Sequence, residues 1–64
     1  MSAKHSIHEF VSPADLPMAI DMSRVEAVTG DPHNADNSII VTGTDSYKVK
    51  CFWVEAVRIW RDAL

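Results

Sequence analysis

This chain is short and contains little cysteine or leucine. With 64 residues it can form one domain at most, because chains of this size bury only about 60% of the surface that their unfolded form exposes. The single cysteine, Cys51, excludes an internal disulfide, whereas a secreted domain this small usually needs several. No apolar stretch approaches the ~20 residues of a membrane span, and the N-terminus lacks the apolar run of a signal peptide. We therefore expect a single domain over residues 1–64, in a reducing cytoplasm and away from membranes.

Positive charge is also scarce. Six Lys and Arg stand against nine Asp and Glu, and the formal net charge of −3 gives no general attraction to nucleic acid. The charges are unevenly spread: residues 1–45 carry a net charge of −5, whereas residues 46–64 carry +2. The sequence therefore predicts an acidic body with a basic C-terminal end.

The apolar residues favour strands. Val and Ile are frequent but the only leucines are Leu16 and Leu64, and β-branched side chains fit a pleated surface better than a helix. Alternating or continuous apolar runs predict strands over residues 5–11, 18–22, 25–29, 38–42 and 47–50. The first should be an edge strand that stops before Pro13, and the second should place Met18, Ile20 and Met22 on one face.

The connections follow from turn-forming residues. Ser12 is expected to cap a helical turn over 13–16, because proline suits the first helical position. Residues 30–37 are almost all polar or turn formers, which predicts a solvated loop. The run 38–42 should be a central strand buried on both faces, and the turn over 43–46 should make a hairpin with residues 47–50.

Residues 52–64 change to helical spacing. Trp53, Val57, Trp60 and Leu64 fall within about 40° of one direction at 100° per residue, which predicts an amphipathic helix. Trp53 and Val57 are expected to meet Ile39 and Val41 in the core. The expected fold is α+β: a small antiparallel β-meander of four or five strands with one C-terminal helix.

The apolar stripe of this helix is wider than one small sheet needs. A 64-residue core is marginal, so self-association is expected, with a two-fold dimer as the simplest geometry. The predicted interface comprises residues on the flank of the stripe: Phe52, Ile59, Trp60 and Ala63.

The order of apolar segments resembles that of the short FlbD-like proteins of flagellar operons and of phage and prophage genomes. The matching stretches are Ile20–Val28, Ser38–Gly43, Tyr47–Lys50 and Val54–Val57, so the resemblance spans roughly residues 18–60. Residues 1–17 have no counterpart in the FlbD-like proteins, and the loop over residues 30–37 is longer than theirs. The resemblance implies a small accessory protein without catalysis, of the kind that mobile elements carry, and it does not transfer a flagellar role.

Reactive and metal-binding patterns are sparse. His5 and His8 would point to opposite sides of a strand, His33 lies far off in a loop, and Cys51 is the single thiol, so we expect no metal site. Cys51 follows Lys50 near a helix start, but a small apolar role at the strand-to-helix junction is the favoured interpretation. No pair of acids, Gly-rich loop or nucleophile motif is present, and we expect neither an enzyme nor a cofactor.

One group of residues indicates binding. The C-terminal end carries an aromatic residue and four cations that suit bases and phosphates: Tyr47, Lys48, Lys50, Arg58 and Arg61. We expect a non-enzymatic protein-binding module, plausible as a phage or mobile-element accessory protein that inhibits or regulates a host complex, as in anti-defence. The alternatives are a homo-oligomeric nucleotide or nucleic-acid binder, such as a phage sponge for nucleotide signals, and a structural self-assembling subunit.

Overall fold

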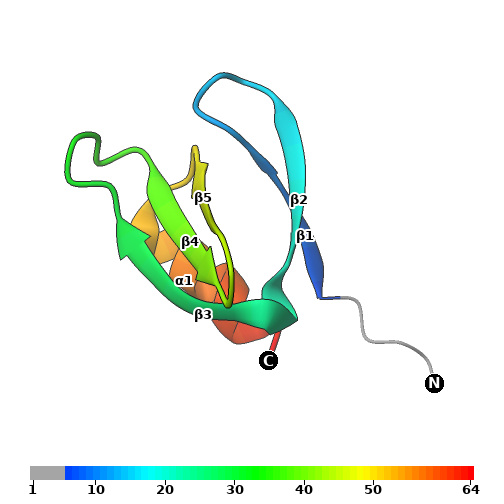
Figure 1. The fold of residues 1–64 in the computed structure, drawn as a ribbon. Helices are drawn as coiled ribbons and strands as arrows, with labels where there is room; N and C mark the ends of the chain where they lie inside the picture. Colours follow the sequence, from blue (N-terminus) through cyan, green and yellow to red (C-terminus); the bar gives the residue numbers. More distant parts are fainter. Residues whose placement is uncertain (1–5) are drawn as a thin grey trace.

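The computed structural model describes residues 6–64, which form five strands, one short 3-10 turn and one helix (Figure 1). The elements, in chain order, are β1 (Ile7–Val11), β2 (Pro17–Asp21), η1 (Met22–Arg24), β3 (Val25–Gly30), β4 (Ser38–Thr42), β5 (Ser46–Val49) and α1 (Trp53–Asp62). This confirms the α+β fold with a C-terminal helix. Consecutive strands pair antiparallel within two separate sheets, β1-β2 and β3-β4-β5, and β2 does not pair with β3.

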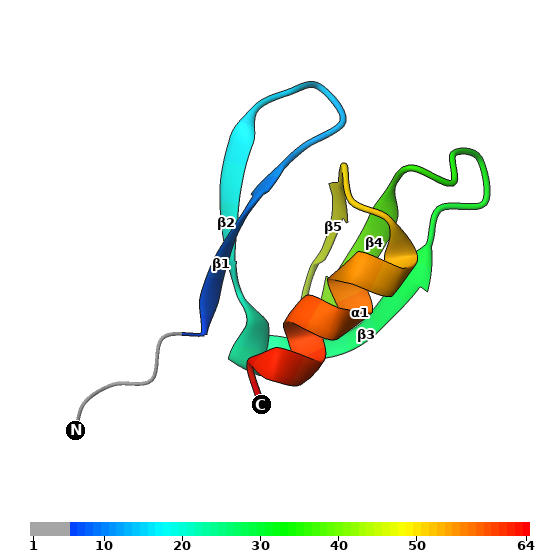
Figure 2. The same ribbon diagram turned by 180° about the vertical axis from the view of Figure 1, so that it is seen from behind.

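The division into two sheets arises at η1. Asp21 caps this turn, because its Oδ1 accepts hydrogen bonds from the backbone N–H of Ser23 at 3.0 Å and from its hydroxyl at 2.6 Å. The turn breaks the ladder between β2 and β3, so the β1-β2 hairpin stands beside the three-stranded sheet. The helix crosses one face of that sheet, as the reverse view shows (Figure 2), and Ala56 shares the core with Phe10 and Ile20 of the hairpin.

The connection between β1 and β2 is a hairpin turn and not the predicted helical turn. Ser12 N–H donates to Leu16 O at 2.8 Å, which closes the hairpin. Ser12 Oγ does accept from the N–H groups of Ala14 and Leu16, at 3.2 Å each. Asp15, however, has a φ of 65°, a left-handed conformation that cannot continue a right-handed helix.

The strand predictions are otherwise confirmed. β1 pairs only with β2, β4 lies at the centre of its sheet, and β4 and β5 form the predicted hairpin. Ile20 and Met22 are buried and Met18 is half-buried, as the shared face required, although Met22 already belongs to η1. β4 is completely covered on one face only: Ile40 is inaccessible, whereas Ile39 and Val41 are half-buried.

The core therefore differs from the predicted set. It consists of residues from the hairpin, the sheet and one small helical side chain: Phe10, Ile20, Met22, Val25, Val28, Ile40, Val49 and Ala56. The prediction that Ile39, Val41 and Trp53 meet in the core is wrong, while Val57 does pack against it. Ile39 and Val41 lie on the strand face opposite Ile40, because side chains alternate along a strand.

The helix buries a different stripe from the one expected. Ala56 is inaccessible, and Ile59, Trp60 and Ala63 pack against the core, whereas Trp53 is 47% exposed and Leu64 is 79% exposed. Trp53 donates its indole N–H to Val28 O at 2.9 Å, at the rim of the sheet. This hydrogen bond holds the ring over the free edge of β3 and turns the small Ala56 toward the sheet.

The loop between β3 and β4 is less solvated than predicted. Asp31 and Asn37 are buried at its two ends, where Asp31 N–H donates to Asn37 O at 3.2 Å. Asp31 also accepts a hydrogen bond from the backbone N–H of His33 at 2.9 Å and pairs with Lys48 Nζ at 3.3 Å. The loop is thus fastened to β5 by a carboxylate that water barely reaches.

Candidate functional site

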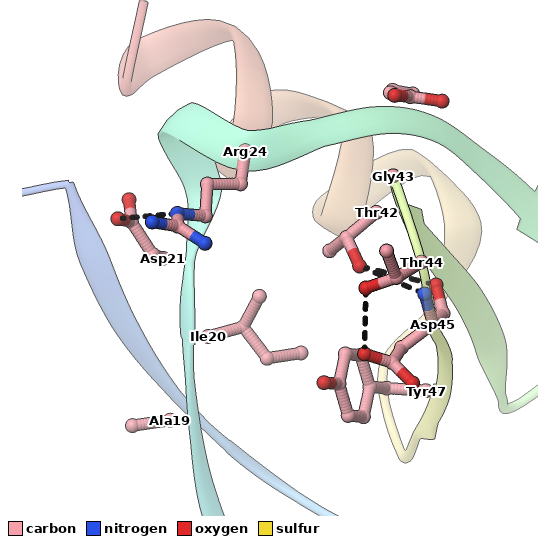
Figure 3. A pocket seen from close by; sticks show the side chains of 10 residues that line it. Ala19, Ile20, Asp21, Arg24, Thr42, Gly43, Thr44, Asp45 and Tyr47 are labelled. Carbon is pink, nitrogen blue, oxygen red and sulfur yellow. Dashed lines mark hydrogen bonds and ion pairs between the residues drawn. The ribbon is translucent and has the colours of Figure 1, made fainter.

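A cleft of about 630 Å³ lies between the β1-β2 hairpin and the turn that joins β4 to β5 (Figure 3). It is lined by residues of β2, η1, β3 and the turn: Ala19, Ile20, Asp21, Arg24, Glu26, Thr42, Gly43, Thr44, Asp45 and Tyr47. Ile20 and Tyr47 lie on its opposite walls. The cleft is therefore a product of the fold, assembled from segments that are far apart in the sequence.

The turn that forms one wall is held rigidly. Thr42 N–H donates to Asp45 O at 2.8 Å, and Asp45 N–H donates back to Thr42 Oγ1 at 3.3 Å. Gly43 lies beneath Glu26, since a Cβ built on the glycine would come 3.4 Å from Glu26 Oε2. These contacts hold the Gly43 turn against β3 at one wall of the cleft.

The cleft carries net negative charge. Three carboxylates, those of Asp21, Glu26 and Asp45, face one guanidinium, that of Arg24. Arg24 Nε is 3.9 Å from Asp21 Oδ2, whereas Glu26 and Asp45 have no ion-pair partner among residues 6–64. Hydrogen bonds from Ser23, together with Arg24, hold the pKa of Asp21 below its usual value. Asp21 is therefore ionised at neutral pH.

The predicted binding residues do not form one site. Tyr47 lines the cleft, but its neighbour Lys48 points to the other face of β5 and pairs with Asp31. Lys50 pairs with Asp15, and Arg58 pairs with Glu55. Arg61 is exposed on α1 and is not among the residues that line the cleft.

The remaining predicted positions are distributed as follows. Ile59, Trp60 and Ala63 are half-buried against the core, and Phe52 is 61% exposed at the start of α1 beside the exposed Val54. Cys51 is half-buried, and burial together with the nearby Glu55 raises the pKa of its thiol. This environment suits the small apolar role that the sequence favoured over a nucleophile.

Metal ligands do not gather in the part of the chain that the structure describes. No group of three His, Cys, Asp or Glu side chains within residues 6–64 is arranged to hold a metal ion, and His5 lies outside that range. Among the same residues, no helix is long and apolar enough to cross a membrane.

The sequence missed most of the cleft. Asp21 ends β2, Glu26 is the second residue of β3 and Asp45 lies in the turn before β5, so each looks like an isolated polar residue in the sequence. The excess of acids over residues 1–45 was the available signal. It predicted an acidic body but did not show where the acids gather. The pairing of β3 with β4 brings the Gly43 turn beside Glu26, and the hairpin that ends at Asp21 forms the opposite wall.

Comparison of the chain with protein-family models, with curated proteins and with solved structures gave no match. The similarity to FlbD-like proteins stays a prediction. The chemistry of the cleft is therefore the basis for any functional proposal.

The buried Asp31 leads to a prediction about acid. The His33 N–H hydrogen bond and, after it, Lys48 lower the pKa of Asp31 from its usual 3.8. A lowered pKa in the folded state means that ionisation stabilises the fold above the usual pKa, and that this contribution is lost as pH falls through the folded-state pKa. We expect the free energy of unfolding to drop below about pH 4, where unfolded carboxyl groups already bind protons.

Urea denaturation of wild type and Asp31→Asn at about pH 6, 4 and 3 checks this prediction. The variant should be less stable than wild type at pH 6 and should lose less stability on acidification. Its slope should not vanish, because the pKa values of Asp21 and Glu55 are also lowered. Equal acid slopes for the two proteins would show that Asp31 contributes no pH-dependent stability.

Proposed function

We propose that this protein is a non-enzymatic protein-binding module, and that the cleft between the β1-β2 hairpin and the β4-β5 turn binds a positively charged segment of a partner protein. The observation that carries the proposal is the composition of the cleft. Its walls combine three carboxylates, one guanidinium, an aromatic ring and apolar side chains. Opposite charge at a concave surface favours association and selects among partners.

The walls suit the whole of a Lys or Arg side chain. Glu26 and Asp45, which have no ion-pair partner among residues 6–64, supply charge for the head group. Ile20, which points into the cleft opposite Tyr47 (Figure 3), supplies apolar surface for the methylene stem, which long cationic side chains prefer to cover. Tyr47 is 37% exposed in the cleft and offers a ring face for a cation–π contact.

The proposal extends to a regulatory role. Proteins that handle nucleic acid present basic segments to phosphate groups. A module that occupies such a segment competes with the nucleic acid and inhibits or regulates the complex. The net negative charge of the chain and of its cleft supports this role for an accessory protein that acts on a host complex.

The nucleotide-binding alternative has less support. Three of its four cations, Lys48, Lys50 and Arg58, already pair with carboxylates of this chain. A phosphate group would have to displace Asp31, Asp15 or Glu55 to reach them. Tyr47, the aromatic member of the set, lies in an acidic cleft that repels phosphate.

A basic peptide tests the proposed function. The probe is a fluorescent hexapeptide of alternating valine and lysine, and the readout is its anisotropy at low and at physiological salt. The double variant Glu26→Gln/Asp45→Asn should weaken binding about tenfold, because it removes two exposed charge interactions while keeping the shape of the cleft. Binding to wild type should also weaken as salt screens the charges.

The control is Glu9→Gln/Asp36→Asn, which removes the same net charge from exposed positions that do not line the cleft. This control should bind the peptide within about twofold of wild type. If both double variants weaken binding equally, only the overall charge matters and the cleft is not the site. If wild type does not bind the peptide, the proposed function is wrong.

Self-association stays a prediction. Because Ile59, Trp60 and Ala63 pack against the core, the exposed part of the predicted interface is Phe52, next to Val54. We expect a dimer in sedimentation velocity at micromolar concentration, and a melting temperature that rises with protein concentration. Phe52→Ser should shift the equilibrium toward monomer without loss of fold. A single-chain species at all concentrations would contradict the prediction.

A further inference from the structure

The outer edge of β5 presents unpaired backbone groups. Thr42 N–H donates to Asp45 O at 2.8 Å across the β4-β5 turn. Because hydrogen-bonded pairs alternate along an antiparallel ladder, the next such pairs are Ile40 with Tyr47 and Ser38 with Val49. The N–H and C=O groups of the intervening residues, Ser46 and Lys48, therefore point away from β4.

Lys50 confirms this direction. Lys50 is the next alternate residue after Ser46 and Lys48, so its backbone groups should also point away from β4. Its N–H donates to Val11 O of β1 at 2.7 Å. Among residues 6–64 this is the one backbone hydrogen bond between β1 and the end of β5, and the two strands do not pair further along. Figure 1 shows the β1-β2 hairpin standing apart from β5 below this point. The edge is open where Ser46 and Lys48 lie, next to the cleft residues Asp45 and Tyr47.

The side chains leave this edge unguarded. Exposed edge strands usually carry lysines that reach into solvent and block the approach of another strand. Lys48 instead reaches back across β4, so that its Nζ lies 3.3 Å from Asp31 Oδ2. Lys50 is similarly held by Asp15 of the hairpin turn. Neither amine projects over the open backbone groups of β5.

We propose that the partner segment binds in extended form and adds a strand to the outer edge of β5, through the backbone groups of Ser46 and Lys48. This inference rests on the proposed function, and it adds the conformation of the segment. In an extended segment every second side chain faces the same way. Basic residues at alternate positions then lie beside Tyr47 and Asp45, while the backbone pairs with β5.

A second copy of this chain fits the edge less well than a basic segment does. Pairing of β5 with its counterpart about a two-fold axis sets the two Lys48 residues near each other, and like charges across adjacent strands are unfavourable. The acidic cleft beside the edge would also be doubled. The charge of the surroundings therefore favours a foreign basic strand.

Hydrogen exchange on the full chain tests this mode of binding, with the alternating valine–lysine hexapeptide as probe. At saturation, amide exchange at Ser46 and Lys48 should slow at least about tenfold, since each N–H gains a partner. Tyr47 is the internal control, because its N–H faces β4 and should be protected before the peptide is added. Unchanged exchange at Ser46 and Lys48 in the saturated complex would overturn strand addition.

Two variants separate the backbone from the side chain. Lys48→Pro removes an outward N–H, a change that an edge strand tolerates, and Lys48→Ala removes only the side chain. The proline variant should bind the peptide at least about tenfold more weakly than the alanine variant, with circular dichroism showing that both are folded.

Peptides with N-methyl groups at every second residue give the answer if Lys48→Pro does not fold. Methyl groups on the alternate amides that face β5 should abolish binding to wild type. Methyl groups on the other alternate amides, which face away from β5, should leave binding nearly unchanged. Binding that tolerates methyl groups on either set of amides would overturn strand addition and leave the proposed function standing. If wild type does not bind even the unmethylated peptide, both proposals fall.

Discussion

Replacing Ile40 by alanine is expected to destabilise the protein by about 2–5 kcal/mol, the range for a buried aliphatic side chain cut back to a methyl group. Ile40 is completely inaccessible at the centre of β4, the strand that pairs with both β3 and β5. Removing its side chain leaves a cavity between the sheet and the residues that cover it. In a 64-residue domain such a loss takes up much of the total stability.

Urea denaturation followed by circular dichroism measures this loss. Val54→Ala is the matched control, since Val54 is 71% exposed on α1 and its truncation should change the free energy of unfolding by less than about 0.5 kcal/mol. Equal stability of Ile40→Ala and wild type would mean that β4 is not the centre of the core.

Removing the Ser38 hydroxyl should have the second largest effect. Ser38 is completely inaccessible at the start of β4, and its Oγ donates to Cys51 O at 2.6 Å. This bond ties the segment between β5 and α1 to the central strand. Ser38→Ala leaves the carbonyl of Cys51 without that donor, and an unsatisfied polar group in a covered position costs about 1–3 kcal/mol.

The control is Ser46→Ala, the same change at an exposed position of β5. It should leave stability nearly unchanged, and it isolates the role of the buried hydroxyl. Amide exchange adds a local readout: in Ser38→Ala the amides of α1 should exchange faster, because the helix loses its tie to the sheet. A Ser38→Ala protein as stable as wild type would show that water satisfies the carbonyl.

The sequence predicted the fold where local patterns decide it. The run 38–42 and the Gly43 turn define a hairpin from neighbouring residues alone, and period-two spacing placed Ile20 and Met22 on a buried side. The turn after Ser12 was missed because Pro13 suits a helix start as well as a hairpin turn. The left-handed Asp15 and the pairing of β1 with β2 decide in favour of the hairpin.

The core residues of the helix were harder to predict, because several apolar side chains share almost the same direction. Spacing placed Trp53 near the centre of the apolar stripe, which predicted it in the core. The structure buries Ala56, and the indole N–H of Trp53 bonds to Val28 O at the sheet rim. The position of Trp53 therefore depends on the carbonyl of Val28, 25 residues away in the sequence, and local spacing cannot predict such a contact.

The predicted binding site was cationic, whereas the candidate cleft is acidic and only the excess of acids over residues 1–45 indicated its charge. The basic and aromatic residues near the C-terminus are close in sequence, yet ion pairs with Asp31, Asp15 and Glu55 occupy three of the cations. The acids of the cleft, Asp21, Glu26 and Asp45, come from separate elements and line one cleft only in the folded chain. Of the predicted site, Tyr47 alone lines the cleft.

The most direct test of the central claim is a map of where a basic segment binds. The measurement is a ¹⁵N–¹H correlation spectrum of the full chain, titrated with the alternating valine–lysine hexapeptide. Shift changes should concentrate on the residues that line the cleft, over 19–21, 24–26 and 42–47, while α1 stays unchanged. Changes centred on α1, or no changes at saturating peptide, would contradict the account.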